Sequence, residues 1–148
     1  MSDRPVPTLL VTGRRLLATG ARTIGILPAH KKTDVWTVLT DLAGALEEIG
    51  GGPVARIPSW TTWADADTAR AAPAATVQRM EVMIHEQALR SGQVLVDLTG
   101  VDPVLAGTMT SLDGVALVAR AGRTWERRLR ALAGPLPAEK RLGVLLVD

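Results

Sequence analysis

The chain of 148 residues contains no cysteine, no phenylalanine and no tyrosine. The lack of cysteine excludes disulfide bonds, thiolate metal sites and thiol nucleophiles. Because four tryptophans are the only aromatic residues, the core has to be built mainly from aliphatic side chains, and 47% of the residues are hydrophobic. The two histidines, His30 and His85, are too few and too far apart in the sequence to predict a metal cluster.

The net charge is also small, at +2 from 17 basic and 15 acidic side chains. That surplus is too slight for a dedicated nucleic-acid-binding protein. No apolar run approaches the ~20 residues of a membrane-spanning helix. Residues 1–7 are polar and proline-rich, without the hydrophobic core of a signal peptide. We therefore expect one domain over residues 1–148, located in the cytoplasm.

Five short runs along the chain are rich in β-branched and aliphatic residues. They are largely apolar rather than alternating, which is typical of strands that are buried on both faces of a sheet. The predicted strands are residues 23–27, 54–57, 94–97, 115–119 and 142–147.

Helical spacing of apolar residues separates these runs, and the segment at 59–73 is predicted to be a loop with a short helix. Asp34 is the predicted N-cap of the second helix and Thr124 that of the last, while Gly13 should weaken the first. The predicted helices span residues 9–18, 35–49 and 77–89, and a further one follows Thr124. Strands that alternate with helices predict an α/β fold, an open, doubly wound, mostly parallel five-stranded sheet with helices on both faces.

Three segments, in chain order, carry a more specific pattern. The strand at 23–27 (TIGIL) is followed by a loop and by the helix start at 37–46 (TVLTDLAGAL), and residues 93–100 (QVLVDLTG) form an apolar strand that contains Asp97. Residues 113–124 (DGVALVARAGRT) complete the pattern. Together they resemble the P-loop ATPases of the ParA/MinD type and the related bacterial tyrosine-kinase-like ATPases. The resemblance covers most of residues 14–148 and implies a P-loop-NTPase-like fold with strand order 2-3-1-4-5.

The phosphate loop of that family has no counterpart in this chain. If Thr37 takes the place of the family's last loop threonine, Val35 stands where the phosphate-binding lysine would be and Trp36 where the metal-binding serine or threonine would be. His30 falls where ParA-type proteins have their signature lysine. No glycine lies between Ile26 and Ala43 to let backbone amides converge on phosphates. We therefore expect no bound nucleotide and no cofactor.

Asp97 corresponds to the acidic residue that holds magnesium through water in the family. Without a serine or threonine at position 36 the ion lacks its second partner, so Asp97 is expected to be hydrogen-bonded at the end of its strand. Asp97 to Gly100 also fit a DxxG pattern, which is a weak signal. Lys31 and Lys32 could still attract an anion to the helix N-terminus, although paired loop lysines are usually only solvated.

Several other side chains have two interpretations each. The arginine cluster at 120–130 could bind DNA phosphates, an acidic membrane surface or an acidic partner, or it could be a solvated helix face on which Glu126 pairs locally. Trp60 and Trp63 could anchor an interface or pack against the sheet. Glu81 and His85 lie one helical turn apart, but two ligands without a third are more often a surface pair. The arginines of the cluster are Arg120, Arg123, Arg127, Arg128 and Arg130.

These observations lead to the hypothesis of a pseudo-ATPase, a catalytically inactive ParA/MinD-like homologue. It would act as an interaction or regulatory module, with a protein partner or as a homo-oligomer, in intracellular positioning or surface-polysaccharide systems. The interface is expected in the crevice beyond the carboxyl ends of the strands, with Asp102 and Asp113 near its far rim. Its predicted residues are His30, Lys31, Lys32, Trp36, Asp97, Arg120, Arg123 and Arg127.

Two alternatives remain open at this point. One is a divergent ATPase or kinase that uses Lys31 or Lys32 in place of the missing lysine. The other is a nucleic-acid-binding module that uses the arginine cluster.

Overall fold

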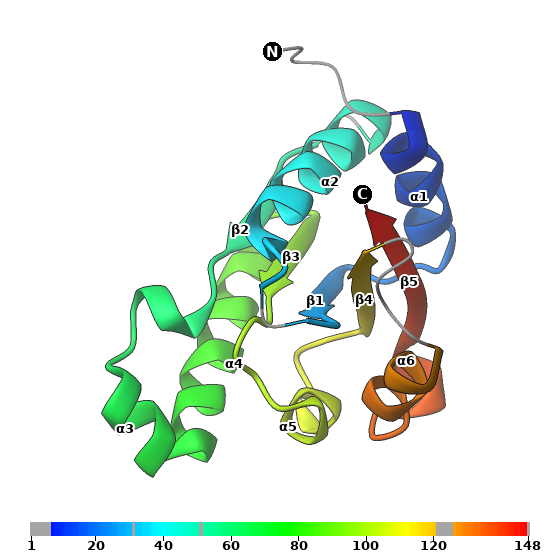
Figure 1. Cartoon of the computed structure of the whole chain (residues 1–148). Helices are drawn as coiled ribbons and strands as arrows, with labels where there is room; N and C mark the ends of the chain where they lie inside the picture. Colours follow the sequence, from blue (N-terminus) through cyan, green and yellow to red (C-terminus); the bar gives the residue numbers. More distant parts are fainter. Residues whose placement is uncertain (1–6, 31, 51, 121–125, 148) are drawn as a thin grey trace.

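The computed structural model of the chain describes residues 7–30, 32–50, 52–120 and 126–147 (Figure 1). Its centre is a five-stranded, fully parallel sheet in the order β2-β3-β1-β4-β5. The five predicted strands and the order implied by the resemblance are confirmed, but the edge strand at 141–147 is mostly exposed rather than buried on both faces. The strands are β1 Thr23–Pro28, β2 Val54–Ile57, β3 Gln93–Asp97, β4 Gly114–Arg120 and β5 Arg141–Val147.

Helices connect the strands, as the alternating pattern predicts. The short α5 was missed because its six residues contain no complete apolar stripe. Thr124, the predicted cap of the last helix, lies outside the described residues. None of the described helices has the length and apolar character to cross a membrane. The helices are α1 Pro7–Ala18, α2 Val35–Gly50, α3 Ala66–Ala71, α4 Pro73–Arg90, α5 Pro103–Thr108 and α6 Glu126–Ala133, with 3₁₀ turns at Trp60–Thr62 and Ala138–Lys140.

Two hydrophobic clusters lie on opposite faces of the sheet. On one face α1 and α2 pack against Ile24, Ile26 and Leu95. On the other face α4, α5 and α6 pack against Val94 and Val96. Neighbouring strand residues thus point to opposite faces, and both faces are covered by helices (Figure 1). The predicted doubly wound α/β architecture is therefore confirmed.

Gly13 has a different role from the one expected of it. A Cβ atom at this position would lie 3.1 Å from Cδ1 of Ile49 and 3.4 Å from Cδ2 of Leu46, both on α2. The missing side chain therefore lets α1 approach α2 closely, and this packing offsets the low helix propensity of glycine.

Asp113 lies at the wrong end of the sheet for the predicted crevice. One of its carboxylate oxygens accepts hydrogen bonds from the backbone N–H groups of Arg22, at 2.8 Å, and Thr23, at 3.2 Å. These residues precede and begin β1, and Asp113 itself comes directly before β4. Because the strands are parallel, Asp113 belongs to the amino edge of the sheet, and its expected place on the crevice rim is wrong.

The core of the central strands generates the first prediction. Leu95 and Leu117 are 0% and 3% exposed, so Leu95→Ala or Leu117→Ala should lower the free energy of unfolding by roughly 2–5 kcal/mol. Denaturant unfolding measures the loss. The control is Leu146→Ala, because Leu146 is 65% exposed on β5 and should change stability by no more than about 0.5 kcal/mol. Equal effects at all three positions would contradict the assignment of the core.

Candidate functional site

The carboxyl ends of β1, β3 and β4 meet at one edge of the sheet. Asp97, the last residue of β3, is in register with Ile26 of β1, and Pro28 of β1 is in register with Val118 of β4. Arg120 ends β4 and is exposed. In an open parallel sheet the crevice beyond this edge is the usual place of a ligand. We call the region beyond this edge the crevice, and the described residues around it belong to the β1–α2 connection, the loop after β3 and the end of β4.

The connection from β1 to α2 is held by hydrogen bonds within the protein itself. The N–H of Ala29 donates to the carbonyl of Val118 at 2.8 Å, and Nε of Arg128 on α6 donates to the carbonyl of Ala29. The N–H of Thr33 donates to the carbonyl of His30 at 3.1 Å. Backbone groups of Ala29, His30 and Thr33 therefore bond to neighbouring elements and to one another.

Asp34 caps α2, as the sequence predicts. Its Oδ1 accepts a hydrogen bond from the N–H of Thr37 at 3.1 Å, and its Oδ2 accepts one from Oγ1 of Thr37 at 2.7 Å. The hydrogen bond from the Thr37 hydroxyl, followed by that from its amide, holds the pKa of Asp34 below the ordinary value of an aspartate. Asp34 is therefore ionised at neutral pH and lies at the positive end of the helix dipole.

The carboxylate of Asp34 takes the place that an anion would need. A helix N-terminus attracts phosphate because its free N–H groups and its dipole favour negative charge. In α2 the protein supplies that charge itself, and a phosphate approaching the same amides would meet an ionised group. Val35, which stands where the family has its lysine, is 1% exposed and packs in the core.

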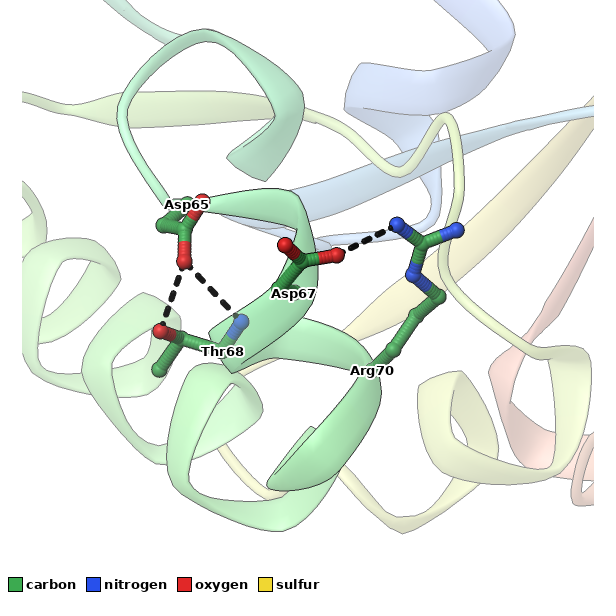
Figure 2. Close-up of polar contacts among 4 residues, drawn as sticks. All are labelled: Asp65, Asp67, Thr68 and Arg70. Atoms are coloured by element: carbon green, nitrogen blue, oxygen red, sulfur yellow. Dashed lines mark hydrogen bonds and ion pairs between the residues drawn. The ribbon is translucent and has the colours of Figure 1, made fainter.

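Asp65 forms the same kind of cap on α3, in a second Asp-x-x-Thr sequence. Its Oδ2 accepts hydrogen bonds from the N–H of Thr68 at 3.2 Å and from the Thr68 hydroxyl at 2.9 Å (Figure 2). The Thr68 hydroxyl is also the main cause of the lowered pKa of Asp65. Asp67 and Arg70 form an ion pair on the same helix at 2.8 Å, with both side chains exposed. This cap provides a natural control for Asp34.

Asp97 is bonded to its own loop, as expected. It is 5% exposed, and its Oδ1 accepts hydrogen bonds from the N–H of Thr99 at 2.9 Å and from Oγ1 of Thr99 at 2.6 Å. Trp36 contributes no oxygen ligand where the family has serine or threonine, and the described residues contain no cluster of three acidic, histidine or cysteine side chains that could hold a metal ion. The residues around Asp97 therefore do not fit a magnesium–nucleotide complex.

A second contact to the Asp97 loop could not be foreseen from the sequence. Oγ of Ser59 donates to the carbonyl of Thr99 at 2.7 Å, and Ser59 is 4% exposed. Trp60 lies against Gly100, whose φ is +84° and where a Cβ atom would come within 2.8 Å of the indole nitrogen. A glycine is required here both for the backbone conformation and for the close approach. We call these two contacts, Ser59 with Thr99 and Trp60 with Gly100, the Ser59–Gly100 contact.

The tryptophans of the β2–α3 connection pack on the protein rather than standing free. Trp60 and Trp63 are partly buried against the core face that contains α4. The guanidinium carbon of Arg79 lies 4.9 Å from the centre of the Trp63 ring, a cation–π contact. Of the two interpretations offered above, the structure supports packing for both residues.

The remaining predicted site residues divide into three groups. His30, Lys32 and Trp36 lie on the β1–α2 connection or at the start of α2, with Lys32 exposed and Trp36 40% exposed. Arg127 is exposed on α6, where Glu126 pairs with Arg130 as expected. Lys31 and Arg123 lie outside the described residues.

Glu81 and His85 lie on α4, away from the crevice. Oε1 of Glu81 accepts a hydrogen bond from the N–H of Ser111 at 3.2 Å. Glu81 thus ties α4 to the loop before β4, and His85 is exposed one turn further on. Glu81 and His85 are therefore a pair of surface side chains rather than a metal pair.

Comparison with known proteins gives a likeness in structure alone. The chain superposes on the solved structure entitled "BceF Tyrosine Kinase Domain" with a TM-score of 0.64, at 13% sequence identity, over 93% of this chain and 73% of that one. No family model and no curated protein sequence matches the chain. At this identity the likeness shows the P-loop-NTPase-like fold, which confirms that part of the resemblance.

The cap of α2 generates a prediction about pH. Asp34→Ala should lower the free energy of unfolding by about 1 kcal/mol near neutral pH, because it removes the N-cap. The folded-state pKa of Asp34 lies below its unfolded value, so this stabilisation is present above the unfolded pKa and is lost as the pH falls through the folded one. Urea unfolding of both proteins at about pH 7 and about pH 3 should show the difference shrinking at the lower pH.

Asp65→Ala is the matched control for this experiment, since it removes an Asp-x-x-Thr cap outside the crevice. Its loss should shrink with falling pH in the same direction. A loss for Asp34→Ala that is the same at both pH values would contradict the role of the ionised carboxylate.

Proposed function

We propose that this protein is a catalytically inactive relative of the P-loop ATPases that works as an interaction or regulatory module. The observation that carries the proposal is the Asp34 carboxylate, which accepts both Thr37 hydrogen bonds at the N-terminus of α2. An enzyme of this fold needs an attractive site for phosphate at that position. Here the position is negative, and Val35 is buried where the resemblance would place the phosphate-binding lysine.

The Asp97 loop supports the same proposal. In nucleotide-driven switches the loops around the phosphates change shape when the nucleotide is hydrolysed. The loop after β3 is instead held by the two hydrogen bonds that Thr99 donates to Asp97 and by the Ser59–Gly100 contact. A loop held in this way offers a surface of constant shape, which suits recognition of a protein.

A partner would meet basic and apolar side chains beside the Asp34 cap. Lys32 on the β1–α2 connection and Arg120 at the end of β4 are exposed, and Trp36 at the start of α2 is 40% exposed. Tryptophan and arginine are favoured anchors of protein interfaces. We therefore propose an acidic protein surface as the partner, in intracellular positioning or surface-polysaccharide systems, which the resemblance suggests.

A kinase is the second candidate function, favoured by the fold likeness to the BceF tyrosine kinase domain. It would have to use Lys32 or Lys31 for the phosphates. The 148 residues contain no tyrosine, so a tyrosine kinase activity would have to act on another segment or another protein.

A nucleic-acid-binding role has less support, because two arginines of the cluster have partners within the chain. Arg130 pairs with Glu126, and Arg128 donates to the carbonyl of Ala29.

Nucleotide titration separates the proposal from the kinase alternative. We expect no calorimetric signal for Mg-ATP or Mg-GTP that corresponds to a dissociation constant below roughly 100 μM, about −5.5 kcal/mol. A tighter constant for either nucleotide would show that the crevice still holds phosphates, and the kinase candidate would then replace the inactive module.

Charge reversal tests the crevice as the partner surface. Lys32→Glu combined with Arg120→Glu should reduce recovery of the partner in a pull-down from native extract, because it places negative charge against an acidic surface. The control, Arg14→Glu with Arg15→Glu, makes the same change in charge at two exposed positions on α1. Equal recovery with both double variants would contradict the crevice as the interface.

A salt-dependent shift of DNA mobility that only the crevice variant abolishes would favour the nucleic-acid role.

A further inference from the structure

The outward face of α4 carries an apolar stripe that no described element covers. Val82 is 53% exposed and Leu89 is 76% exposed, and Ala75 is exposed seven residues before Val82. Residues seven apart in an α-helix lie within about 20° of the same direction. The inward face of the same helix is buried through Met80 and Ile84. Helix α4 is therefore apolar on two opposite sides, and only one of them packs against the sheet.

Charged and polar residues flank this stripe in a definite order. Arg79 and Glu86 lie along one flank, with the base toward the N-terminus and the acid toward the C-terminus, and Gln78 and His85 lie along the other. The guanidinium group of Arg79 also lies over the ring of Trp63. Among the described residues Glu86 forms no ion pair, and both members of this flank are exposed.

We propose that α4 packs antiparallel against α4 of a second copy of this chain, about a two-fold axis that passes beside Val82. With a rise of about 1.5 Å per residue, Arg79 lies about 4.5 Å on one side of Val82 and Glu86 about 6 Å on the other. The two-fold operation therefore brings Glu86 level with Arg79 of the second copy, to within about 1.5 Å along the helix axis. Two such ion pairs form, one at each end.

The other positions of the stripe match in the same register. Leu89 and Ala75 are each seven residues from Val82, so the large side chain of one copy meets the small one of the other. Gln78 comes level with His85 of the second copy, and an amide and an imidazole can share a hydrogen bond. Antiparallel helices meet in this way when their facing positions are apolar and their flanking positions are complementary.

A second copy fits this face better than an unrelated partner does. An isologous interface requires one surface to be complementary to itself. Here each charged residue of the flank comes level with the oppositely charged residue of the second copy. Glu81 does not disturb this balance, because its carboxylate is turned to the N–H of Ser111. The stripe shares no residue with the crevice, so the dimer is independent of the proposed function.

Analytical ultracentrifugation tests the dimer. The wild-type chain at about 100 μM should sediment with a mass of about 31 kDa, twice its 15.7 kDa. Val82→Asp should raise the dissociation constant at least about tenfold, because it places two like charges on the two-fold axis. Val104→Asp is the matched control, since Val104 is 57% exposed on α5, and it should leave the mass at that of the dimer. Circular dichroism checks that each variant is folded.

A charge exchange identifies the register. Glu86→Arg alone gives a flank with two bases, and Arg79→Glu alone gives a flank with two acids, so each variant should be mainly monomeric. Their equimolar mixture should return to the mass of a dimer, because each base then faces an acid across the axis. The proposal is overturned if the wild type is monomeric at several hundred μM, if Val82→Asp and Val104→Asp give the same mass, or if the mixture stays monomeric.

Discussion

The hydrogen bonds between Asp34 and Thr37 determine how β1 is connected to α2, and the character of the crevice follows from that connection. They start α2 directly after a loop that lacks glycine, and they place an ionised carboxylate at the end of the helix that would otherwise attract an anion. With α2 begun in this way, Val35 turns into the core. One capping residue thus stabilises the fold and opposes the binding of phosphate.

The loop beyond β3 is also held by hydrogen bonds within the chain. Thr99 donates two hydrogen bonds to the carboxylate of Asp97, and the Ser59–Gly100 contact holds the next residues from the side of β2. These contacts hold the described loop after β3 without a nucleotide, which supports the proposed role in recognition of a protein. The stripe on α4 adds a second surface, with apolar and charged positions arranged for a copy of the chain itself.

Much of the fold could be predicted from the sequence, because strands buried on both faces are continuous apolar runs and because Asp34 is a strong helix-start signal. The order of the strands came only from the resemblance, since periodicity does not define which strands are neighbours. Contacts between distant residues could not be predicted, as with Ser59 and Thr99, which are 40 residues apart. The expected place of Asp113 on the crevice rim is wrong because Asp113 comes directly before β4, and a residue that precedes a strand lies at the amino edge of the parallel sheet.

The most direct test of the central claim is the titration of the Asp34 carboxyl group, followed by NMR with and without inorganic triphosphate. We expect a pKa below the ordinary value of an aspartate, in the direction set by the Thr37 hydrogen bonds, and no change when triphosphate is added. A pKa at or above the ordinary value would contradict the ionised cap. A rise on adding triphosphate would show that an anion still reaches the N-terminus of α2.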